Sequence, residues 1–160
     1  MKYILVMSMR DKIVNEYKNA LKSKNKSEIS TYRLILSGIK DLDILNRSGP
    51  NKKDTDDSDI SKLLKKMIKQ RSESIYVYKK NNRKDLLEIE QQEVNILSAY
   101  LPKQLTEDEI KNICTETISK LKAENIKDMG KVMGELKKTN SENIDFSIAG
   151  KILKELLNNK

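Results

Sequence analysis

Residues that end helices are scarce in this 160-residue chain, which contains five Gly and two Pro. Lys, Glu, Leu, Ile and Asn are abundant, and this mixture supports helices more readily than turns. The two prolines divide the chain, because Pro50 follows Gly49 and Pro102 follows Leu101. A proline cannot continue a helix and pushes the residue before it out of the helical conformation. The sequence therefore predicts an all-α protein with breaks at these two points.

Apolar residues recur at three- and four-residue spacings before Pro102, which is the pattern of helices with one buried face. These stripes predict a helix over about residues 9–23, a second helix that ends near Ser48, and two more over about residues 58–81 and 83–100. We expect them to form an N-terminal helical bundle of about four helices, with domain bounds 8–100.

The segment after Pro102 opens with a helix-start signal, because Thr106 is followed three residues later by Glu109 in a capping-box pattern. Two further short helices are predicted over about residues 128–138 and 145–158, and Asp128 can cap the first of them. The last helix carries an apolar stripe too large to leave in water, so the three helices should pack together. The prediction is a small three-helix C-terminal domain over residues 103–160.

The net charge of +8 is concentrated in the N-terminal half. Residues 1–84 carry 21 Lys or Arg and 10 Asp or Glu, whereas residues 103–160 carry 11 and 10. A positive field over one half favours polyanionic partners and salt-dependent binding. The alternative is a lysine-rich surface that serves solubility.

The cysteine content and the N-terminal apolar run bear on the compartment. A single Cys114 excludes an intrachain disulfide framework and fits a reducing environment. The apolar run over residues 1–7 is too short for a signal-peptide core or a membrane span, and translation could instead start at Met7 or Met9. We therefore expect a cytoplasmic protein with no membrane partner.

Catalytic groups are few. The chain has no His, which removes the usual general base near neutral pH, and Cys114 lies on the apolar face of its predicted helix without an imidazole to activate it. It is expected to be a core thiol. No Walker loop, paired-cysteine metal motif or dinucleotide fingerprint occurs. We predict no catalytic residue, no metal and no cofactor.

Two carboxylates stand on an otherwise core-facing stripe of the fourth predicted helix, at Glu90 and Glu93. Helical-bundle metal sites of this kind pair Glu with His, which is missing here. Ion pairs or hydrogen bonds are the simpler expectation, with Arg71, Arg83, Arg33 or a helix end as partner.

Two segments of unusual composition carry a family resemblance: residues 83–105, which read RKDLLEIEQQEVNILSAYLPKQL, and residues 128–134, which read DMGKVMG. The chain resembles the GatB/YqeY family from Met9 to Leu157. This family comprises free-standing helical proteins and the tail domain of the B subunit of glutamine-dependent tRNA amidotransferase. The resemblance implies tRNA as a partner. The family's label, carbon–nitrogen ligase with glutamine as amido-N-donor, describes relatives whose catalytic cradle this chain lacks.

Candidate RNA-binding residues form two groups. Gly130 and Gly134 lie four residues apart, so they share one helix face, and lysines border them. The first group is Gly130, Gly134, Lys131, Lys137 and Lys138, and the second group is Lys65, Lys66, Lys69 and Arg71. A bare face with lysines fits RNA phosphates, which are recognised by charge and shape. The alternative is that the glycines admit a neighbouring helix.

Three functional hypotheses follow. The first is a non-catalytic module that binds structured RNA, with tRNA as the ligand that the resemblance implies. The second is an adaptor that docks on an amidotransferase, an aminoacyl-tRNA synthetase or another helical partner. The third is a trans-acting subunit that assists amide transfer. Stacking on single-stranded bases is not expected, because most of the six Tyr fall on or beside apolar stripes.

Overall fold

The computed structural model describes residues 6–140 and 143–159, and within those ranges every regular element is a helix. Seven α-helices and one 3₁₀ helix are present there, which confirms the all-α prediction. The helices belong to two compact units, of which the first ends at Leu101 and the second begins at Pro102. The domains expected over residues 8–100 and 103–160 stay a prediction about independently folding parts. Most of the N-terminal apolar run, residues 1–5, lies outside the described residues.

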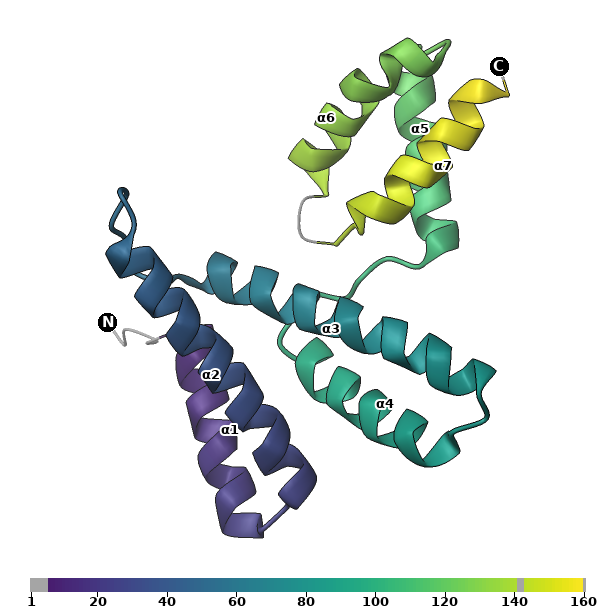
Figure 1. Ribbon diagram of the computed structural model, residues 1–160. Helices are drawn as coiled ribbons and strands as arrows, with labels where there is room; N and C mark the ends of the chain where they lie inside the picture. Colours follow the sequence, from purple (N-terminus) through teal and green to yellow (C-terminus); the bar gives the residue numbers. More distant parts are fainter. Residues whose placement is uncertain (1–5, 141–142, 160) are drawn as a thin grey trace. The chain divides into compact units, whose positions relative to one another are not determined.

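The first unit is built from two antiparallel helix pairs (Figure 1). Its helices are α1 (Met9–Ser23), α2 (Lys26–Ser48), α3 (Asp57–Lys80) and α4 (Lys84–Ser98). Both tight connections use a residue in the left-handed region, Lys24 at φ 56° and Asn82 at φ 53°. The two pairs share one buried core, formed by Ile13, Ala20, Tyr32, Ile35, Ile39, Ile60, Leu64, Met67 and Leu97.

The connector between α2 and α3 is fastened by polar contacts. The ammonium of Lys53 contacts the carboxylate of Asp59 at 2.8 Å, and the amide of Asn46 donates to the hydroxyl of Thr55 at 3.0 Å. Asp56 and Asp59 form a capping box that starts α3. The helix predicted over about residues 58–81 therefore begins at Asp57, where this box places its first turn.

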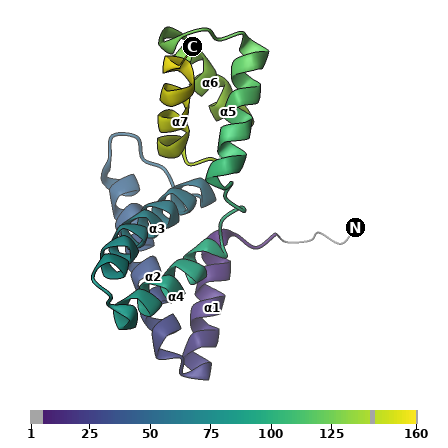
Figure 2. The same ribbon diagram turned by 90° about the vertical axis from the view of Figure 1, so that its right-hand side faces the viewer.

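The second unit contains α5 (Glu107–Leu121), the 3₁₀ helix Ile126–Asp128, α6 (Met129–Thr139) and α7 (Phe146–Asn158). The three α-helices pack around a separate core (Figure 2). Its fully buried members include Ile110, Cys114, Val132, Leu136 and Leu153. The capping box of Thr106 and Glu109 is present, so the signal that predicted the start of α5 is confirmed.

Among the helices at the described positions, none combines the length and the apolar character needed to cross a bilayer.

Candidate nucleic-acid interface

The glycine face of α6 is open. A Cβ built on Gly130 or on Gly134 would meet no heavy atom within 4 Å outside the local helix backbone, and both residues are exposed. The opposite face of α6 carries Val132 and Leu136, which are fully buried in the second core. Within the described part of the second unit, the interpretation that the glycines admit a neighbouring helix is therefore wrong.

Lysines border this face on both sides. At about 100° per residue, Lys137 falls beside Gly130, while Lys131 and Lys138 fall beyond Gly134. All three lysines are exposed. The ammonium of Lys137 lies 5.9 Å from the ring centroid of Phe146 at the start of α7, a cation–π distance. The structure thus brings the first group of predicted residues together on one solvent-facing surface, which we call the α6 face.

The turn before α6 is shaped by Asp128. Its Oδ2 accepts hydrogen bonds from the backbone amides of Glu124 at 2.9 Å and Asn125 at 3.3 Å. These bonds stabilise the carboxylate and lower the pKa of Asp128. The expected cap of α6 by this residue is wrong, because its side chain makes no capping bond to that helix. The carboxylate instead closes the 3₁₀ turn that precedes α6.

The second predicted group lies on α3 and is divided by the fold. Lys66 and Lys69 are exposed, and Lys65 is half-buried. Arg71 faces the other way: its Nε lies 2.5 Å from Oε2 of Glu93 on α4, and its Nη1 donates to the carbonyl of Met67 at 3.3 Å. Arg71 is thus engaged inside the first unit, which separates it from the solvent-facing lysines.

Glu93 of α4 and Cys114 of α5 lie where the sequence predicted a paired carboxylate and a core thiol. The pairing of Glu93 with Arg71 confirms the expected ion pair, and Glu90 is half-buried on the same helix. Cys114 is fully buried in the second core, as expected of a core thiol, and burial raises the pKa of its thiol. No cluster of three or more potential metal-ligating His, Cys, Asp or Glu side chains occurs among the positions described.

One exposed residue was missed by the sequence analysis. Tyr76 on α3 is 70 % exposed, although Tyr78, two positions later, is half-buried. Side chains two positions apart on a helix point to nearly opposite sides, so the two tyrosines cannot both lie on the buried face. The sequence did contain a signal for this. Tyr78 follows Ile75 at the three-residue spacing of the buried face, and Tyr76 does not fit that spacing, so it should have been placed on the solvent-facing side of the helix.

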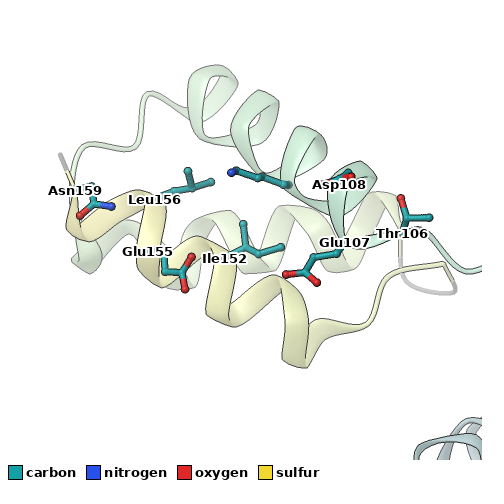
Figure 3. A pocket seen from close by; sticks show the side chains of 8 residues that line it. Thr106, Glu107, Asp108, Ile152, Glu155, Leu156 and Asn159 are labelled. Carbon is teal, nitrogen blue, oxygen red and sulfur yellow. The ribbon is translucent and has the colours of Figure 1, made fainter. Parts of the chain in front are cut away.

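A pocket of about 540 Å³ opens in the second unit between the start of α5 and the surface of α7 (Figure 3). Glu107 and Asp108 line it from α5 and Glu155 lines it from α7, with Lys111 as a single basic side chain. This carboxylate-rich lining repels phosphate, so the pocket is unsuited to RNA. The α6 face is the better candidate in this unit.

Comparisons with known proteins place nearly the whole chain in one family. A family model described as Yqey-like protein matches residues 10–157. "Altered inheritance of mitochondria protein 41, mitochondrial" of Pyrenophora tritici-repentis is 35% identical over 121 residues, which cover 74% of this chain and 64% of that protein. The protein of the same name in Lachancea thermotolerans is 38% identical over 97 residues, covering 59% of this chain and 50% of the relative. The chain thus spans half to just under two thirds of the length of these relatives.

These names contradict the expectation of a cytoplasmic protein, because the similar proteins of P. tritici-repentis, L. thermotolerans and Clavispora lusitaniae are all named as mitochondrial. The expectation was based on one cysteine and a short apolar run. Both features fit any compartment without disulfides, so they could not separate cytoplasm from mitochondrion.

Proposed function

The chain belongs to the family of YqeY-like proteins, and from this membership we propose that it is a non-catalytic module that binds structured RNA through the α6 face. The observation that carries the proposal is the open surface at Gly130 and Gly134 between exposed lysines. Glycine costs about 1 kcal/mol relative to alanine within a helix. No packing need in the described second unit accounts for that cost at Gly134, so a ligand that approaches the backbone closely is the better explanation.

The chemistry of the α6 face suits a phosphate backbone. Lysines supply mobile point charges that neutralise phosphates and release counterions, and a surface without side chains lets the sugar–phosphate chain lie against the helix. Such contacts position a nucleic acid without reading its bases. Recognition would therefore depend on RNA shape, as in the contacts that proteins make with folded RNA.

We propose tRNA as the RNA. The support is the resemblance of this chain to the tail domain of the amidotransferase B subunit, in which tRNA is the implied partner. The carbon–nitrogen ligase label, with glutamine as amido-N-donor, would then belong to an assembly with a separate catalytic subunit. The mitochondrial names of the similar fungal proteins favour mitochondrial tRNA as the first RNA to test.

The test is a tRNA gel shift across a salt series, with an RNA duplex of equal length as competitor. The variant Lys131→Ala/Lys137→Ala/Lys138→Ala should weaken binding and reduce the slope of log affinity against log salt by about one unit for each phosphate that is no longer neutralised. A charge-matched control is Lys111→Ala/Lys151→Ala/Lys154→Ala, three exposed lysines of the same unit. Equal weakening in the two triple variants would reject the α6 face.

A second candidate function is an adaptor that docks on an amidotransferase or an aminoacyl-tRNA synthetase. It is favoured by apolar side chains near the end of α2, where Ile44 is 58 % and Leu45 is 66 % exposed. Binding of the purified partner in the presence of ribonuclease, abolished in Ile44→Ser/Leu45→Ser, would support it. The third hypothesis, assistance of amide transfer in trans, requires that deletion of the chain impair amidation of misacylated tRNA.

A further inference from the structure

Tyr76 stands in a line of lysines on the outer face of α3. Counting 100° per residue, Lys69 and Lys80 lie within roughly 40° of Tyr76 around the helix, and Lys62 lies on the same side. These three lysines are exposed, as is Tyr76. We call this surface, made of Lys62, Lys69, Tyr76 and Lys80, the α3 stripe. It extends over 18 residue steps, or about 27 Å along the axis.

The charge of this part of α3 is strongly one-sided. Residues 62–80 contain seven Lys or Arg and one acidic residue, Glu73. Arg71 is paired with Glu93, so its charge is balanced within the fold. The lysines leave a positive field along the helix, and a polyanion is the partner that complements it.

The exposed ring of Tyr76 indicates which kind of polyanion binds here. Tyr17, Tyr32, Tyr78 and Tyr100 are buried or half-buried in the first unit, whereas Tyr76 leaves 70 % of its surface in water. Its ring adds nothing to phosphate neutralisation, but it can stack on a nucleobase. A base offers its face when it is unpaired, as in a loop or a single-stranded end, since the bases of a duplex are already stacked.

We infer that the α3 stripe binds an unpaired segment of RNA, with the Tyr76 ring stacked on one base and Lys69 and Lys80 on flanking phosphates. This inference rests on the proposed function in taking RNA as the ligand. It adds a second surface, in the first unit, that selects unpaired over paired RNA. An acidic protein segment would also be attracted to the lysines, but it would not require the aromatic ring.

A spectroscopic probe tests the stacking directly. The chain has no Trp, so Tyr76→Trp places a single tryptophan at the proposed stacking position, and its emission can be excited selectively over that of the remaining Tyr. Titration with a 12-nucleotide oligoadenylate should quench this fluorescence, whereas a duplex or inorganic polyphosphate at equal phosphate concentration should leave it nearly unchanged. The matched control is Val77→Trp, one residue along and 50 % exposed, which faces about 100° away. Similar quenching at both positions, or quenching by polyphosphate, would overturn the inference.

Affinity measurements separate stacking from charge. Tyr76→Ala should weaken oligonucleotide binding about tenfold, the lower-middle part of the range for loss of one stacked base, whereas Tyr76→Phe should retain it. Duplex binding should be equal in all three proteins. Because Tyr76 is exposed, both variants should keep the helical circular dichroism spectrum. Equal oligonucleotide affinity of Tyr76→Ala and wild type would contradict the inference. Competition by polyglutamate as strong as competition by unlabelled oligoadenylate at the same charge concentration would contradict it too, because the ring would then add nothing.

The outcomes are distinguishable from those of the α6 face. If the triple lysine variant of α6 binds tRNA normally while Tyr76→Ala loses oligonucleotide affinity, the proposed role of the α6 face is rejected and that of the α3 stripe is supported. If the triple lysine variant loses tRNA affinity while Tyr76→Ala keeps its oligonucleotide affinity, the α6 face is supported and the α3 stripe is rejected.

Discussion

The Nε of Arg71 lies 2.5 Å from Oε2 of Glu93 and joins α3 to α4 inside the first unit. Their side chains are 12% and 16% exposed, so each would be left largely desolvated without its partner. Glu93→Gln should therefore lower the free energy of unfolding by about 1–3 kcal/mol, because a buried charge loses its counter-charge. Urea denaturation followed by circular dichroism measures this decrease.

The same pair separates a role in stability from a role in RNA binding. Arg71→Met should destabilise the fold yet leave affinity for RNA unchanged, whereas Lys69→Ala should reduce affinity and leave stability nearly unchanged. In Arg71→Met/Glu93→Leu, which removes both charges, stability should recover at least part of what either single variant loses. If Arg71→Met lowers RNA affinity at temperatures where the variant is folded, Arg71 takes part in RNA binding after all.

Two helical glycines should respond in different ways to alanine. At Gly134 a Cβ meets nothing within 4 Å, so Gly134→Ala should raise the free energy of unfolding by about 1 kcal/mol through helix propensity. At Gly38 a Cβ would lie 3.0 Å from Cδ2 of Leu63, where α2 approaches α3, and this crowding opposes the gain. Gly38→Ala should therefore be less stable than Gly134→Ala. Gains of equal size would show that Leu63 moves aside freely.

Gly134→Ala also connects stability to function. If the α6 face binds RNA, the added methyl group should stabilise the protein and weaken tRNA binding at the same time. A variant that is more stable and binds tRNA equally well would argue against close approach of RNA to the helix backbone.

How much of this was predictable differs from element to element. The expected helix over residues 9–23 coincides with α1, and Thr106 with Glu109 correctly started α5, because stripes and caps are local features of sequence. Asp128 shows the limit of such patterns. An aspartate before a helix can cap it or fold back on the preceding turn, and the choice depends on the backbone geometry of the turn.

Exposure of the candidate residues depends on tertiary contacts, which sequence spacing does not supply. Gly130 and Gly134 are compatible with a packed face or an open one until the positions of α5 and α7 are known. Arg71 and Lys69 look alike in sequence as basic residues of one segment, yet the position of Glu93 on α4 draws Arg71 into the fold. The charge of this region was evident from sequence, and its division was not.

The carboxylate of Asp43 should make stability fall in acid. Arg10 donates two hydrogen bonds to it, at 2.6 and 2.9 Å, and these contacts, with a further one from Thr55, lower the pKa of Asp43 from 3.8 to about 2. Because the folded-state pKa is the lower one, the stabilisation is complete above about pH 4 and disappears as the pH falls toward 2. The 37% exposure of the Arg10 side chain screens the pair, so we expect about 1 kcal/mol.

The measurement for Asp43 is the unfolding free energy of wild type and Asp43→Asn between pH 2 and 6. The difference between the two proteins should shrink as the pH falls below 4, since other carboxylates contribute equally to both. A difference that is constant over this range would mean that the Arg10 contact does not stabilise the ionised form.

Cys114 offers a direct measure of how well the second unit holds together. The thiol is fully buried, and burial raises its pKa, so both access and ionisation are suppressed in the folded protein. Reaction with a disulfide reagent at pH 8 should be at least about 100-fold slower in native buffer than in denaturant, since it requires opening of the core.

Ile152→Ala, which removes apolar packing from the same core, should accelerate labelling of Cys114, whereas Lys154→Ala on the exposed side of α7 should not. Labelling of the wild type at the rate of the unfolded chain would show that α5, α6 and α7 do not form a stable core in isolation from a partner.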